Sequence, residues 1–248
     1  MNPLFWLFAL AGTALQIVLL SVLVRDRYWR SLPFVFVYSV ALLVTNGVDW
    51  YFRITLPKVS GAGAGGLSNE YFWLNDCLRQ FCLFLVVMSL LYRAVGHSNK
   101  GKQLRHAITI AFALVAVVSA FVVHDSHTSQ WPTLVIRNVS FTVVFVNLIV
   151  WSALIRTGDP ERLPLMLTAG VGLQMTGEAI GQALRSSPMR HGHYFVVVIG
   201  NVILVLAHIL CLVTWLYALK ADQRRVAASA RRTLDDGAAF PLVSNPIV

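Results

Sequence analysis

The stretch AFALVAVVSAFVV, at Ala111–Val123, decides the class of this protein. Its side chains lack the alternation of polar and apolar residues that is typical of a β-barrel strand. About 20 such residues in a helix span the ~30 Å hydrocarbon core of a bilayer. The stretch therefore predicts a transmembrane helix, and most of the chain is of the same kind.

The composition extends this interpretation to the whole chain of 248 residues. Hydrophobic residues make up 57% of it and charged residues only 12%, with a mean hydropathy of +0.67, whereas soluble domains carry about 25% charged residues. We predict an all-α membrane protein, a seven-transmembrane-helix bundle that forms one domain over residues 1–220. The expected helices cover residues 3–24, 31–52, 71–95, 106–124, 132–155, 163–184 and 194–219. A basic tail at 221–248 is expected to be flexible, apart from a short interfacial helix at Gln223–Leu234.

The distribution of basic residues predicts the orientation. The first, third and fifth connections and the tail hold 14 Lys and Arg residues, against 5 on the opposite side. Cytoplasmic segments carry such an excess, which places the N-terminus outside and the C-terminus in the cytoplasm. The net charge of +9 then indicates contact with anionic lipid at the inner face. Nucleic acid is not an expected partner, because the basic residues are scattered over short connections.

Polar residues inside the expected helices are the candidates for function, because ionisable groups are costly in a membrane. With the predicted orientation, several of them fall at a similar depth in the outer half. The candidate ligand-binding residues are Asp49, Asp76, Arg79, Arg137, Asn138, Glu178 and Asn201. They predict one polar cluster that is open toward the outside.

Three interpretations of this cluster remain open. It could bind a small polar or charged molecule, since Arg pairs well with carboxylates and phosphates. It could relay protons or ions through Glu178. It could also be a salt-bridge network, Asp76 with Arg79 and Glu178 with Arg137, that only fixes the helix register.

Cofactor and metal sites are weakly supported. The lysines lie at Lys58, Lys100, Lys102 and Lys220, so none stands mid-membrane for a retinal Schiff base. The sequence does not favour a haem, because membrane haems usually take two axial histidines within the span, and His208 alone lies deep in an expected helix. Weak metal candidates in the outer loops are His124, His127, His191 and His193. No catalytic motif is present, so no enzyme is predicted.

Glycines in the sixth expected helix predict close packing, with a hinge beside Glu178 as the alternative. Gly177 and Gly181 form a GxxxG pattern, which lets two helices approach each other closely. In the seventh expected helix, His208 shares a seven-residue spacing with Asn201 and Trp215 and is expected to face the bundle.

Three short motifs carry a resemblance to a known group of proteins. They are VIRN with Arg137, GVGLQMTGEA at Gly170–Ala179, and WLYAL at Trp215–Leu219. With them, the chain resembles uncharacterised bacterial seven-helix inner-membrane proteins. The resemblance implies a bacterial cytoplasmic membrane and supplies no activity.

The leading functional hypothesis is a sensor, receptor-like or accessory protein with an outward-facing pocket for a small polar ligand. The expected tail is too short for an output domain, so signalling would require a partner on the cytoplasmic side. A proton-coupled transporter and a structural subunit of a larger membrane complex are the alternatives.

Overall fold

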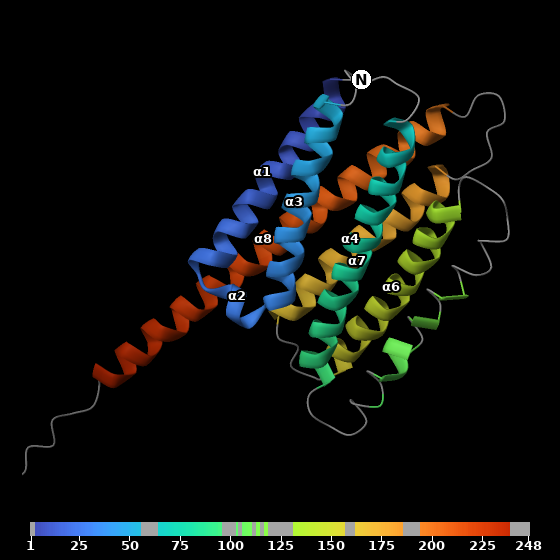
Figure 1. Cartoon of the computed structure of the whole chain (residues 1–248). Helices are drawn as coiled ribbons and strands as arrows, with labels where there is room; N and C mark the ends of the chain where they lie inside the picture. Colours follow the sequence, from blue (N-terminus) through green and yellow to red (C-terminus); the bar gives the residue numbers. More distant parts are fainter. Residues whose placement is uncertain are drawn as a thin grey trace, which may run out of the picture.

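The computed structural model describes residues 3–55, 64–95, 106–110, 131–156, 162–185 and 194–238, together with 103, 113–114 and 117–118. Over this part of the chain the structure is helical, with no strand (Figure 1). The prediction of an all-α protein is confirmed there. The long helices are α1 (Pro3–Arg25), α3 (Pro33–Thr55), α4 (Ala64–Val95), α6 (Trp131–Arg156), α7 (Arg162–Arg185) and α8 (Tyr194–Ala238), and the short α2 (Tyr28–Ser31) joins α1 to α3.

Four stretches in these helices are long and apolar enough to cross a membrane. They are Leu7–Arg25, Pro33–Tyr51, Leu74–Arg93 and Phe195–Ser229, and α6 adds the shorter apolar stretch Asn138–Ser152. These helices are compatible with a multi-pass membrane protein. Part of the expected helix at 106–124 lies outside the described residues, and α7 is not among these apolar stretches, so the bundle of seven spans remains a prediction.

Large apolar side chains are exposed on the outer faces of the helices. Examples are Leu10 of α1, Val44 of α3, Phe145 of α6 and Leu210 of α8. So much exposed apolar surface is unusual for a soluble monomer, but lipid tails solvate it as well as a protein core would.

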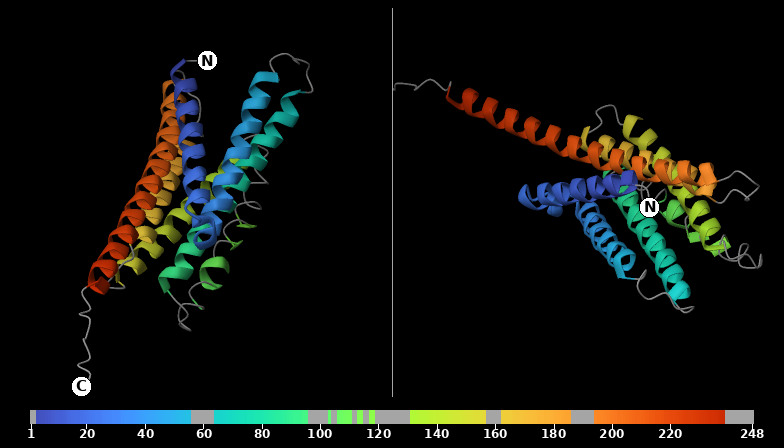
Figure 2. Two further views of the ribbon diagram at one scale, coloured as in Figure 1. Left: turned by 90° about the vertical axis from the view of Figure 1, so that its left-hand side faces the viewer. Right: turned by 90° about the horizontal axis from the view of Figure 1, so that it is seen from above.

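The six long helices described pack in a ring. Neighbouring pairs in contact are α1 with α3, α3 with α4, α4 with α6, α6 with α7, α7 with α8, and α8 with α1, and α4 also reaches across to α7. The most extensive contact joins α7 to α8, and Figure 2 shows α8 extending beyond the other helices at its C-terminal end. This arrangement brings the polar faces of α3, α4 and α7 together.

Two helices extend past the ends expected from hydropathy. α4 begins at Ala64 instead of at 71, and α8 continues without a break to Ala238 instead of ending at 219. The part of the expected flexible tail up to Ala238 is therefore a continuation of α8. Apolarity marks the part of a helix that lipid surrounds, whereas the backbone hydrogen bonds that define a helix continue into polar sequence.

Two side-chain hydrogen bonds fasten α8 to the corner between α1 and α3. The Tyr28 hydroxyl donates to Asp222 Oδ2 at 2.8 Å, and the Gln223 amide donates to Asp26 Oδ2. Arg27 makes the corner with a φ of 58°, a left-handed conformation that is uncommon outside glycine. Burial, together with the hydrogen bond to Asp222, raises the pKa of the Tyr28 hydroxyl above its usual range, so it remains the protonated donor.

Replacement of Tyr28 by phenylalanine tests this fastening. We expect Tyr28→Phe to cost about 1 kcal/mol, the usual value of one net hydrogen bond. Amides of α8 beyond Gln223 should then exchange faster with solvent in hydrogen-exchange mass spectrometry. Tyr217→Phe is the matched control, because Tyr217 is exposed on the same helix. Equal exchange in both variants would contradict a fastening role.

Candidate functional site

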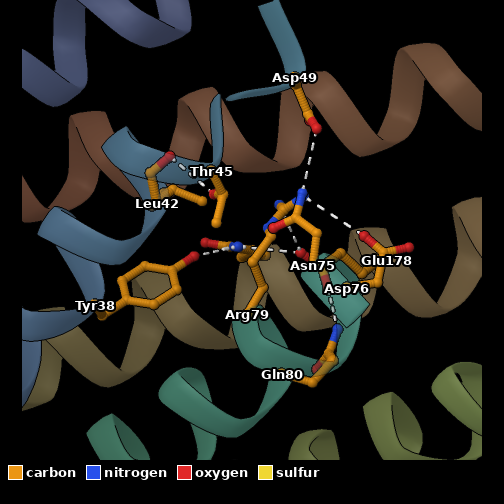
Figure 3. A network of polar contacts seen from close by, with 10 residues as sticks. Tyr38, Leu42, Thr45, Asp49, Asn75, Asp76, Arg79, Gln80 and Glu178 are labelled. Carbon is orange, nitrogen blue, oxygen red and sulfur yellow. Dashed lines mark hydrogen bonds and ion pairs between the residues drawn. The ribbon is translucent and has the colours of Figure 1, made fainter. Parts of the chain in front are cut away.

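A polar network joins α3, α4 and α7 in the interior of the ring (Figure 3). Its members come from positions that share a helix face, such as Asn75 and Arg79 on α4 or Gln174 and Glu178 on α7, each pair four residues apart. The residues that take part are Tyr38 and Asp49 of α3, Asn75, Asp76, Arg79 and Gln80 of α4, and Gln174 and Glu178 of α7.

The Glu178 carboxylate is the centre of this network. Its Oε1 accepts hydrogen bonds from Gln174 Nε2 at 3.1 Å and from Arg79 Nη2 at 3.5 Å, and its Oε2 accepts one from Gln80 Nε2. Each carboxylate oxygen therefore accepts a hydrogen bond from a glutamine amide, and Oε1 also accepts one from the guanidinium. The side chain is only 10% exposed, so these donors replace the water that a carboxylate would otherwise require.

The contacts of Arg79 with Asp76 and Glu178 are long. Its Nη1 lies 3.9 Å from Asp76 Oδ1 and its Nη2 lies 3.5 Å from Glu178 Oε1, whereas a strong charge-assisted hydrogen bond measures about 2.7–2.9 Å. Its Nε atom is buried and has no hydrogen-bond partner. The guanidinium is held between two carboxylates and still has donor capacity to spare.

Exposure decreases along this row of charges. The side chains are 36% exposed at Asp76, 25% at Arg79 and 10% at Glu178. Asp76 stands in the first turn of the apolar stretch Leu74–Arg93 and Arg79 in the second. The row therefore leads from the end of a candidate span to a buried carboxylate.

Three amide oxygens of the network are buried without a donor. Asn75 Nδ2 donates to Asp49 Oδ1 at 3.5 Å, which leaves Asn75 Oδ1 without a hydrogen bond. Gln80 and Gln174 turn their amide nitrogens to Glu178, and their Oε1 atoms also lack a partner. Buried polar atoms normally have a hydrogen-bond partner, so these three oxygens are unused acceptors.

Tyr38 connects the network to α8. Its hydroxyl accepts a hydrogen bond from Gln174 Nε2 at 2.7 Å, and its ring packs edge-on against Trp215 with 5.7 Å between the ring centroids. Trp215 in turn donates from Nε1 to the Leu167 carbonyl at 3.0 Å. Both aromatic side chains are almost fully buried, so α3, α7 and α8 are joined by polar contacts within the apolar core.

A smaller polar group lies on α1. Asn46 of α3 donates to Gln16 Oε1 at 2.9 Å, and Gln16 is fully buried. His208 of α8 faces α1 at Gly12, where a Cβ atom would lie 3.9 Å from its ring. Both ring nitrogens of His208 are buried without a hydrogen-bond partner. His208 thus faces the bundle, as its spacing predicts.

The structure brings four of the sequence-predicted site residues together: Asp49, Asp76, Arg79 and Glu178. Asn138 and Asn201 are half-buried on α6 and α8. Within the described part of the chain, no hydrogen bond joins the side chain of either residue to this group.

Other predicted residues lie partly or wholly outside the described part of the chain. Arg137 belongs to α6, but its side chain is not among those described. The histidine candidates His124, His127, His191 and His193 lie outside the described residues altogether. Over the described residues, no group of three or more His, Cys, Asp or Glu side chains is placed to hold a metal ion.

Sequence reasoning missed the role of Tyr38. A signal was available, because Tyr38, Thr45 and Asp49 follow one another at spacings of seven and four residues and therefore share one face of α3. Tyrosine is common at membrane interfaces, which makes a single one uninformative. Its position on the polar face of the helix was the better indication.

Comparison with known proteins gives no further information on the site. No family model matches the chain, and searches of curated proteins and of solved structures give no significant match. The resemblance to bacterial seven-helix inner-membrane proteins therefore remains a prediction.

Proposed function

We propose that this chain is a receptor-like or accessory membrane protein whose polar network binds a small polar ligand from the outer side. It is a seven-helix bundle of a bacterial cytoplasmic membrane, with the N-terminus outside and the C-terminus in the cytoplasm. The start of α1 and the end of α8 lie at opposite ends of the helices (Figure 2), as this topology requires. The distribution of basic residues supports the same orientation.

The unused hydrogen-bonding capacity around Glu178 is the observation that carries the proposal. Arg79 Nε is a buried donor without an acceptor, and the side-chain oxygens of Asn75, Gln80 and Gln174 are buried acceptors without a donor. A network that served only to fix helix register would gain most if every polar atom were paired. A ligand with donors and acceptors of its own would satisfy these atoms.

Native mass spectrometry of the gently solubilised full chain tests this proposal. The informative variant is Arg79→Gln/Glu178→Gln, which removes both charges together and leaves neither stranded in the core. We expect wild-type protein to retain a small molecule that the double variant lacks. Asn147→Leu is the matched control, because it removes a buried hydrogen bond from Asn147 to the Thr168 carbonyl. That variant should retain the molecule.

Two outcomes would contradict a ligand site. One is a wild-type chain that carries no small molecule, and the other is equal retention by wild type and the double variant. Either result, combined with lower stability of the double variant, would favour a structural subunit in which the network only fixes the helix register.

A proton-coupled carrier is the second candidate, and His208 favours it. Its two ring nitrogens are buried without hydrogen-bond partners. The same helix bundle holds the buried Glu178 carboxylate. Imidazole and carboxylate are the groups that relay protons in membrane proteins. In reconstituted vesicles, a carrier would show proton flux that stops in Glu178→Gln.

The C-terminal part of α8 indicates the partners. Lys220, Arg224 and Arg225 are exposed where α8 leaves its most apolar part, and they would contact anionic lipid at the inner face. The part of α8 beyond Gln223 is exposed and offers a surface for a cytoplasmic or membrane protein partner. A receptor-like role requires such a partner, because the chain itself holds no output domain in its described part.

A further inference from the structure

The α4 face that lines the network carries two unused polar atoms of opposite kind. Asn75 Oδ1 is a buried acceptor without a donor, and Arg79 Nε is a buried donor without an acceptor. The two residues are four positions apart on one helix, so they share a face with about 5–6 Å between their Cβ atoms. A molecule that satisfies both must carry a donor and an acceptor a short distance apart.

This part of α4 also carries two opposite charges close together. The Asp76 carboxylate and the Arg79 guanidinium lie 3.9 Å apart at their nearest atoms. A purely anionic ligand at Arg79 would face the carboxylates of Asp76 and Glu178, and a purely cationic one would face the guanidinium. A molecule with both charges places each one beside its complement.

If Arg79 turns toward such a molecule, Glu178 keeps two of its three hydrogen-bond donors. Gln174 and Gln80 already donate to the two oxygens of Glu178, so that carboxylate stays hydrogen-bonded when the guanidinium moves. The contacts of Arg79 are also long, at 3.5 and 3.9 Å. The forked guanidinium can then bind a carboxylate through two parallel N–H groups.

We infer that the ligand of this site is a small zwitterion with a carboxylate and an ammonium group, as in an α-amino acid. This inference rests on the proposed function and specifies its ligand. The carboxylate binds Arg79, and the ammonium group donates to Asp76 and to Asn75 Oδ1. Exposure decreases from Asp76 through Arg79 to Glu178, so the ligand would bind at the more exposed end of this row.

Calorimetric titration of the full chain in detergent micelles provides the test. The probes are the protein α-amino acids, each followed by the analogue without the ammonium group and the analogue without the carboxylate, such as alanine, propionate and ethylamine. We expect at least one amino acid to bind, and both of its analogues to bind at least about tenfold more weakly, a loss of one charged contact.

Two variants separate the halves of the site. Asp76→Asn should weaken binding of the amino acid and strengthen binding of its ammonium-free analogue, which no longer faces the Asp76 carboxylate, so that the preference for the amino acid is lost. Arg79→Lys should weaken both, because lysine keeps the charge but lacks the planar fork. Asp222→Asn is the control, since this carboxylate lies on α8 outside the network and hydrogen-bonds Tyr28.

The results distinguish this inference from the proposed function. If an ammonium-free or carboxylate-free analogue binds as tightly as the amino acid, the zwitterion inference is overturned and a polar-ligand site remains. If no probe binds to folded wild-type protein, the inference is also overturned. The proposed function then stands only when native mass spectrometry finds a retained molecule of another class, and it fails when the wild-type chain is bare.

Discussion

Glu178→Leu is expected to destabilise the protein by about 3 kcal/mol or more, because it removes the acceptor of three donors and leaves the Arg79 charge without a buried partner. The double variant Arg79→Leu/Glu178→Leu should recover part of this loss. Its two apolar side chains strand no charge, and such replacements of buried pairs are often close to neutral. The free energies of unfolding can be compared in mixed micelles of increasing denaturing-detergent content.

With Arg79→Leu as the other single variant, the comparison is a double-mutant cycle. It also includes a matched variant. Glu178→Gln keeps the shape of the side chain and can still hydrogen-bond the amides of Gln80 and Gln174, so it should lose less than Glu178→Leu. Residues in direct contact normally show a coupling of about 0.5–3 kcal/mol. Additive losses in the cycle would mean that Arg79 and Glu178 do not form the pair seen in the structure.

Gly177→Ala and Gly181→Ala are expected to be the next most damaging substitutions. A Cβ at Gly177 would lie 2.1 Å from the Ala207 Cβ, and one at Gly181 would lie 2.9 Å from the Gly200 carbonyl oxygen of α8. The helices α7 and α8 would have to separate, at a cost of about 1–3 kcal/mol per site. Gly47→Ala is the control, because a Cβ there meets nothing within 4 Å, and it should raise stability by up to about 1 kcal/mol.

A second substitution can reverse the first of these losses. Because the closest contact of the new Cβ at position 177 is the Ala207 Cβ, Gly177→Ala/Ala207→Gly should regain most of the stability. The same unfolding measurement applies to both variants. A double variant no more stable than Gly177→Ala would show that this contact does not set the distance between α7 and α8.

Hydropathy was sufficient to predict an all-helical membrane protein, but it misplaced two helix ends. The starts and ends of α1, α3, α6 and α7 follow the apolar stretches closely, since polar connections interrupt them. α4 and α8 continue into polar sequence, where hydropathy falls although the backbone stays helical. Hydropathy reflects whether a segment prefers lipid or water, so it cannot locate the end of a helix that continues into polar sequence.

Part of the candidate site could be predicted from the sequence, because the depth of each polar residue in the membrane could be estimated. Depth could be estimated because the helices alternate in direction, and this placed Asp49, Asp76, Arg79 and Glu178 at one level. The spacing of three residues on one helix predicted the pairing of Asp76 with Arg79. The contact of Glu178 with Arg79 was not predicted, because it depends on which helices touch. Contact between α4 and α7 across the ring brings Arg79 and Gln80 to Glu178, whereas Gln174 lies four residues before Glu178 on α7 itself.

Because α8 is one continuous helix, a tilt at one point along it moves its distant residues. This helix is pressed against α7 where Ala207 meets Gly177, and it is hydrogen-bonded to the α1–α3 corner through Asp222. These two points on α8 are about 22 Å apart at 1.5 Å per residue. A tilt of about 5° at the α7 contact therefore shifts Asp222 by about 2 Å, which is enough to break a 2.8 Å hydrogen bond to Tyr28. Small movements near the polar network are thereby converted into the making or breaking of a contact at the opposite end of the protein.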